Sequence, residues 1–123
     1  MKIFFKLAAM FYVFLLTLAL LIPIEFILKR NLATSEPSNE SAYLIHLILF
    51  FGLYLSFFIA FKNKQLIIIF CISYGIIIEY LQIITHRGFS YGDIFFNLIG
   101  LITAYLAVKI SLYLYTKFSK ILY

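Results

Sequence analysis

Residues 75–100, GIIIEYLQIITHRGFSYGDIFFNLIG, consist of two apolar segments joined by a short polar loop. The apolar segments belong to longer runs, and a bilayer core of about 30 Å needs roughly 20 apolar residues of helix. Glu79, Gln82 and Asn97 interrupt these runs with polar groups. The stretch therefore predicts two antiparallel membrane helices that carry polar side chains close to the loop between them.

The composition of the whole chain also indicates a membrane protein. Its 123 residues are 65% hydrophobic, 20% aromatic and only 12% charged. A soluble domain of this size cannot bury so much apolar surface, because small domains leave a large share of their surface exposed. The net charge of +5 comes from Lys and Arg residues scattered at segment ends instead of gathered in a basic block. This placement is typical of membrane topology and gives no support to nucleic-acid binding.

Four apolar runs have the length of a membrane-spanning helix. They cover about residues 4–28, 42–61, 65–84 and 94–116. Backbone groups in lipid must bond internally and an alternating barrel pattern is missing from the sequence, so the runs are predicted to be helices. The first run is too long for the apolar part of a signal peptide and is interpreted as a retained helix. Residues 1–123 are therefore expected to form a single domain, an all-α integral membrane four-helix bundle.

The orientation follows from the distribution of Lys and Arg. Seven of them lie at the N-terminus, in the second connection and at the C-terminal end, whereas three lie in the first and third connections. The positive-inside rule then predicts that both termini are cytoplasmic and that the 85–93 loop faces outward.

Small and polar residues recur on one face of each of the last two predicted helices. The third helix carries Cys71, Gly75, Glu79, Gln82 and His86 on such a face, and the fourth carries Asp93, Asn97, Gly100, Ala104, Ala107 and Ser111. Such faces let membrane helices approach closely and form hydrogen bonds across the contact. We expect these two helices to pack on each other, with Gly75, Gly100 and Ala104 at the contact. Cys71, the single cysteine, is expected to be a small buried hydrophobe.

The polar groups inside the predicted helices share one leaflet. At 1.5 Å per residue, Glu79 lies roughly 9 Å and Asn97 roughly 6 Å from the loop between their helices, and His46 is similarly deep. A bundle would bring these residues to one pocket that opens outward. A carboxylate at this depth costs a few kcal/mol and is by default a functional hypothesis. Two alternatives stay open: an interhelical hydrogen bond at Glu79, and a capping or snorkelling role for His46.

The loop residues have simpler interpretations beside the functional one. Arg87 and Asp93 could form a solvated pair worth less than about 1 kcal/mol. Asp93 also fits as the N-cap of the last helix, and Ser90 as part of a turn. The sequence has no nucleophile–base motif, no phosphate loop and no closely spaced histidine pair, so it predicts neither a cofactor nor a metal.

The polar positions resemble a known family pattern. The pattern is Glu79-x-x-Gln82, then Arg87-x-x-Ser90-x-x-Asp93, then Asn97-x-x-Gly100. It is similar to the signature of the VanZ-like family of integral membrane proteins, named for teicoplanin resistance, over nearly the whole chain. His46 stands where the family has a histidine at the start of its second helix. The family's Asp-Lys pair, four and three residues before that histidine, is replaced here by Ala42 and Tyr43.

The resemblance implies a multi-pass protein of the bacterial cytoplasmic (inner) membrane, in a family named for low-level resistance to the glycopeptide teicoplanin. We expect a non-enzymatic protein whose outer-leaflet pocket binds a polar or anionic headgroup of a membrane lipid, a cell-wall precursor or a glycopeptide. The expected ligand-binding residues are His46, Glu79, Gln82, Arg87, Ser90, Asp93 and Asn97, with Arg87 on the anionic group.

Three other functions remain open on the sequence. The first is an enzyme acting on a lipid-linked envelope substrate, with Glu79 or Asp93 as base and His46 as acid. The second is a transporter, which the apolar cytoplasmic halves of the helices disfavour. The third is a non-catalytic assembly protein of the membrane. The oligomeric state has no signal in the sequence.

Overall fold

The structure is a computed structural model that describes residues 2–22, 39–85 and 88–119. Over these residues it consists of four helices and no strands. The helices are α1 (Lys2–Leu21), α3 (Asn39–Ala60), α4 (Lys64–Ile84) and α5 (Tyr91–Ser119). Each of the four is long and apolar enough to cross a membrane. The predicted all-α, multi-pass membrane architecture is therefore confirmed.

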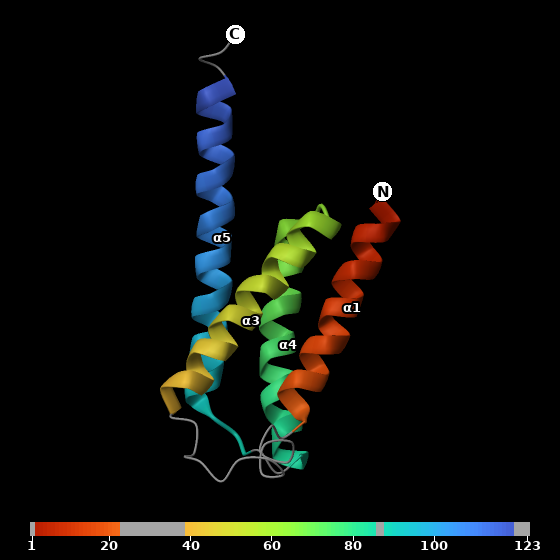
Figure 1. The fold of residues 1–123 in the computed structure, drawn as a ribbon, viewed down its shortest axis with the longest axis vertical. Helices are drawn as coiled ribbons and strands as arrows, with labels where there is room; N and C mark the ends of the chain where they lie inside the picture. The colour runs from red at the N-terminus through yellow and green to blue at the C-terminus, as the bar shows by residue number, and fades with distance from the viewer. Residues whose placement is uncertain (1, 23–38, 86–87, 120–123) are drawn as a thin grey trace.

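The helices run alternately up and down, so that the start of α1 and the end of α5 lie at one end of the bundle (Figure 1). The connection between α4 and α5 lies at the opposite end, together with the start of α3. Helix α3 is central, because it contacts each of the other three described helices and has its most extensive contact with α5. Helix α5 continues well past the other helices at the end of the bundle that carries the termini (Figure 1).

Three helix boundaries differ from the sequence prediction or refine it. Helix α1 ends at Leu21, before a bend at Ile22, whereas the predicted first helix ran to residue 28; the rest of that prediction lies outside the described residues. The short turn before α4 is as predicted, and the Asn63 side chain caps α4 by accepting from the backbone N–H groups of Gln65 and Leu66 at 3.2 and 3.3 Å.

Helix α5 begins at Tyr91, three residues earlier than predicted. The Ser90 hydroxyl oxygen accepts from the Asp93 backbone N–H at 3.2 Å, as an N-cap serine does. The expectation that Asp93 caps this helix is therefore wrong, and Ser90 is the cap. Asp93 lies in the first turn, where the positive end of the helix dipole favours a carboxylate.

The core is apolar and the outer surface is apolar as well, as expected of a chain surrounded by lipid. The buried apolar residues are Ala9, Leu16, Leu20, Phe50, Leu53, Tyr54, Phe57, Ile67, Cys71, Ile78, Leu101 and Ala104. Large side chains such as Phe4 and Phe11 on α1 are 68% and 60% exposed. In water such a surface would be costly, whereas lipid covers it without penalty.

The predicted small and polar faces are buried over most of their length. Residues Cys71, Gly75, Glu79 and Gln82 of α4 and Asn97, Gly100 and Ala104 of α5 are all buried. The prediction fails at Ser111, which is exposed because α5 there extends beyond the other described helices (Figure 1).

Gly100 determines how closely α5 approaches α3. A Cβ atom at this position would overlap the carbonyl oxygen of Leu47 on α3. Gly75 makes room for an α3 side chain in the same way, since its Cβ would lie 3.0 Å from the Phe50 ring. Helices α4 and α5 also contact each other, and a Cβ on Gly75 would lie 3.6 Å from Nδ2 of Asn97 on α5. The tightest approach at each of the two glycines is nevertheless to α3.

Candidate functional site

The centre of the candidate site is His46, which α3 buries to 2% exposure. Its Nδ1 atom lies 3.0 Å from Oδ1 of Asn97 on α5. An amide oxygen only accepts hydrogen bonds, so Nδ1 carries the hydrogen and donates it to Asn97. When the ring is neutral, its other nitrogen, Nε2, presents a lone pair to the opposite side; when it is protonated, Nε2 is a second donor.

Asp93 faces that second nitrogen. Its Oδ2 atom lies 3.6 Å from Nε2 of His46, and its side chain is 16% exposed. The first turn of α5 holds Asp93 in this position, because Ser90 caps the helix three residues earlier. Asp93 is therefore the most accessible acidic group of the site.

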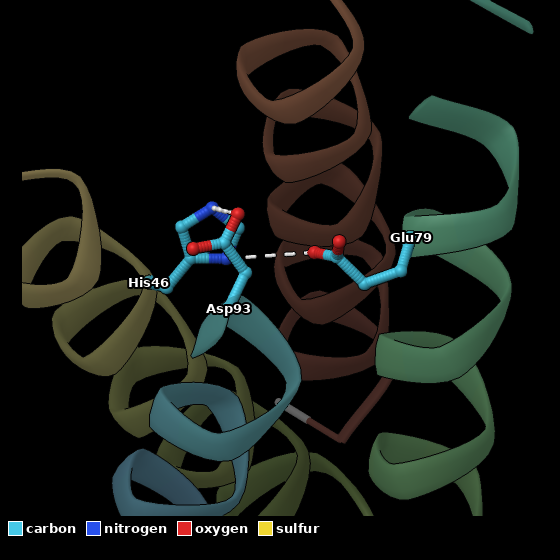
Figure 2. Close-up of side chains that lie close together, drawn as sticks. All are labelled: His46, Glu79 and Asp93. Carbon is cyan, nitrogen blue, oxygen red and sulfur yellow. Dashed lines mark ion pairs between the residues drawn. The ribbon is translucent and has the colours of Figure 1, made fainter. Parts of the chain in front are cut away.

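Glu79 approaches the histidine from α4. Its side chain has no exposed surface, and its Oε1 atom lies 4.0 Å from Nδ1 of His46 (Figure 2). Its other oxygen, Oε2, accepts from the backbone N–H of Ser90 at 3.4 Å. The carboxylate thus joins α4 to the start of α5 across the loop.

The first turn of α5 is supported by Tyr43 of α3. The ring of Tyr43 stacks on that of Phe96, with centroids 4.9 Å apart and planes 1° from parallel. Tyr43 also covers Gly92, where a Cβ would come within 2.6 Å of its ring. Tyr43 therefore packs against the turn that carries Asp93.

Two predicted site residues are not part of this cluster as the structure describes it. Gln82 points to α1 instead, and its Nε2 donates to the backbone oxygen of Leu20 at 3.1 Å. That bond ties α4 to the last turn of α1. Arg87 lies outside the described residues.

The remaining predicted site residues converge. His46, Glu79, Asp93 and Asn97 come from three helices and meet within reach of one another, and Ser90 contacts both carboxylate-bearing residues through its backbone N–H and its hydroxyl. At 1.5 Å per residue, His46 lies about 10 Å from the start of α3 and Glu79 about 8 Å from the end of α4. The four side chains thus share one end of the bundle, as the sequence predicted.

The chemistry of the cluster is that of an imidazole between two carboxylates. One ligand atom from each of His46, Glu79 and Asp93 lies within 4.8 Å of the other two. Such a group can share a proton, bind a hydrogen-bond donor or hold a cation. The sequence analysis placed these three residues in one pocket but predicted no metal, because the three come from different helices and no local spacing of metal ligands connects them.

Together, the fold and the cluster define a multi-pass α-helical membrane protein with a buried polar site at one end of its bundle. Comparison with models of protein families, with curated proteins and with solved structures gave no match to this chain. The likeness to the VanZ-like family therefore rests on the residue pattern alone.

Proposed function

We propose that this chain is a VanZ-like protein of the bacterial inner membrane that binds the polar headgroup of a membrane lipid or a lipid-linked cell-wall precursor. The observation that supports the proposal is the convergence of His46, Glu79, Asp93 and Asn97 at one end of the bundle. Ionisable groups inside a membrane protein face a partner or a wet cavity, since lipid solvates them poorly. A headgroup is the polar partner that is always present at this depth.

The accepting atoms of the cluster indicate which part of a headgroup it binds. Glu79 and Asp93 offer carboxylate oxygens, which accept from ammonium, amide and hydroxyl groups. Asp93, at 16% side-chain exposure, is the contact open to an incoming ligand, and the buried Glu79 lies behind it. We assign the anionic part of the headgroup to Arg87, which lies six residues before Asp93 in the loop sequence.

The proposal also states in which leaflet of the membrane the cluster lies. Lys62 and Lys64 flank the turn between α3 and α4, at the end of the bundle opposite the cluster. The positive-inside rule favours that end for the cytoplasm, which puts the cluster in the outer leaflet. Lipid-linked cell-wall precursors expose their headgroups on this side.

A retention experiment tests the proposal. The full chain is purified from bacterial membranes in mild detergent, and co-purifying lipids are identified by native mass spectrometry. We expect a specific polar lipid on the wild-type chain and its loss in Asp93→Asn, which removes charge at nearly constant shape. Glu36→Gln, a carboxylate change in the first connection, is the matched control and should keep the lipid. Identical lipid profiles for all three chains would remove the proposal.

The link to glycopeptides is tested separately. A chain that sequesters a precursor headgroup would lower the sensitivity of its host to teicoplanin. The wild-type chain, Glu79→Gln and Asp93→Asn are expressed at matched levels in a susceptible host. We expect reduced sensitivity with the wild type only; unchanged sensitivity with the wild type would limit the function to lipid binding.

An enzyme acting on a lipid-linked substrate is the second candidate. The observation in its favour is the orientation of His46, with Nδ1 held by Asn97 and Nε2 directed at Asp93. A ring held in one tautomer beside a carboxylate is suited to general acid–base catalysis. Turnover of envelope lipids in reconstituted vesicles, lost in His46→Gln, would establish this alternative, and conversion equal to that of empty vesicles would reject it.

A further inference from the structure

We propose that His46, Glu79 and Asp93 form the binding site of a divalent transition-metal ion of the Zn²⁺ and Mn²⁺ class. This proposal rests on the proposed function, because it names the ion that the headgroup-binding cluster holds when a headgroup binds. The three side chains come from α3, α4 and α5 and point toward one another (Figure 2). Their ligand atoms lie within 4.8 Å of one another.

The hydrogen bond between His46 and Asn97 prepares the ring for a metal. Nδ1 donates to the amide oxygen at 3.0 Å, which leaves the lone pair of Nε2 directed toward Asp93. Histidines that bind metals almost always donate their other ring N–H to such an oxygen, because this fixes the tautomer and the ring orientation. Asn97, itself 2% exposed, thus has the role of an outer-shell partner.

The gap between His46 and Asp93 has the width that an ion requires. Nε2 and Oδ2 are 3.6 Å apart, and both present lone pairs when the ring is neutral. Two ligands bound at about 2.0–2.2 Å in a tetrahedral arrangement lie roughly 3.4 Å apart. A cation between the two atoms turns their repulsion into attraction. The competing explanation is a proton on Nε2, donated to Asp93, and it is an outcome of the test below.

Glu79 completes the site by rotating. Its Oε1 atom is 4.0 Å from Nδ1 of the ring, so it lies nearer to the edge that binds Asn97 than to Nε2. The bond that its other oxygen accepts from Ser90 is long, at 3.4 Å. A rotation of the glutamate side chain by about 1 Å would bring Oε1 to the ion while the helices stay in place.

An ion in this position compensates the charge of the acidic cluster. Two carboxylates and a neutral imidazole balance the charge of a divalent ion, which lowers the cost of burying them. Three protein ligands leave a coordination position open, as in metal sites that bind substrates. A hydroxyl or amide oxygen of the headgroup fits that position, while Arg87 keeps the anionic part. The imidazole favours Zn²⁺ over Ca²⁺ and Mg²⁺, which prefer oxygen ligands alone, and the two carboxylates also suit Mn²⁺.

Metal uptake by the full chain tests this proposal. The protein is purified in detergent, stripped with a chelator and dialysed against Zn²⁺, Mn²⁺, Ca²⁺ or Mg²⁺, and bound metal is measured by mass spectrometry. We expect one Zn²⁺ or Mn²⁺ per chain and no retained Ca²⁺ or Mg²⁺. Asp93→Asn and His46→Gln should weaken binding at least tenfold. Glu36→Gln and His86→Gln, which change a carboxylate and the chain's other histidine, are the matched controls and should bind normally.

Co²⁺ uptake provides a readout that needs no variant. Bound to the wild-type chain, Co²⁺ should give the visible absorption of a low-coordinate site with nitrogen and oxygen ligands. Substoichiometric uptake of every ion by the wild type, or equal uptake by His46→Gln, would overturn the proposal and leave a shared proton only. The lipid-retention experiment, repeated in chelator, separates the two proposals. Retention without metal uptake refutes the ion alone, and metal uptake without lipid retention refutes the headgroup alone.

Discussion

Nδ1 of His46 and Oδ1 of Asn97 lie 3.0 Å apart in the buried interface between α3 and α5. The bond joins the two helices that have the most extensive contact in the bundle. It also fixes which ring nitrogen faces Asp93, so the packing of the fold and the chemistry of the site depend on the same pair.

The first prediction concerns the energy of this pair. In a double-mutant cycle of His46→Phe and Asn97→Leu, we expect a coupling free energy of about 0.5–1.5 kcal/mol, the net contribution of a typical buried hydrogen bond. The measurement is the free energy of unfolding of the full chain in detergent. Additivity of the two changes to within about 0.3–0.5 kcal/mol would show that the pair is not formed.

The second prediction concerns the approach of α5 to α3. Gly100→Ala should destabilise the chain by about 1–3 kcal/mol, because the added methyl group meets the Leu47 backbone, which cannot move without its helix. Gly52→Ala is the matched control, since its Cβ would meet only the hydroxyl end of the Tyr12 side chain. Unfolding in detergent measures both. Equal effects at the two positions would contradict the close helix crossing.

The third prediction separates Gln82 from the ligand site. Gln82→Leu removes the bond to the Leu20 carbonyl and should cost about 0.5–1.5 kcal/mol of stability, the net contribution of a typical hydrogen bond. Metal uptake and lipid retention should stay at wild-type levels at a temperature where the variant is folded. Loss of either with unchanged stability would return Gln82 to the site.

The fourth prediction concerns Tyr43, which packs against the first turn of α5. Tyr43→Lys removes the stacking on Phe96, worth about 0.5–1.5 kcal/mol, and leaves Gly92 uncovered. The first turn of α5 should loosen, so the variant should bind metal more weakly. Tyr43→Phe keeps the ring and is the control that should bind as the wild type does. Tighter binding by Tyr43→Lys would mean that the lysine contributes to the site instead.

The sequence was sufficient to predict the helices and their buried faces. Length and apolarity decide what spans a membrane, and the periodicity of Gly75, Glu79 and Asn97 decides which face is buried, so both signals are local. The position of His46, Glu79 and Asn97 at one end of the bundle could be predicted by counting residues inward from the loops. The cytoplasmic placement of both termini stays a prediction from charge.

Which helices pack against each other, and where individual side chains point, could not be predicted in this way. Periodicity shows that Gly100 is buried but not that it meets Leu47 of α3, because any neighbouring helix would bury the same face. Gln82 lies on the same helical face as Glu79, yet its side chain bonds to the end of α1. That contact depends on where α1 runs in the bundle, which the spacing of residues within α4 does not reveal. Helix α5 starts early because Ser90 caps it. Serine and aspartate are about equally favoured as N-caps, so the sequence could not decide between Ser90 and Asp93.

The central claim is that the cluster around His46 contacts a ligand, and nitrogen NMR of the histidine rings tests it most directly. The His86→Gln chain, labelled with ¹⁵N-histidine, carries a single imidazole. We predict a ring protonated at Nδ1 alone when metal and ligand are removed, and a large shift of the Nε2 resonance when Zn²⁺ or the retained lipid is added. A His46 spectrum that is unchanged by both additions would contradict the account.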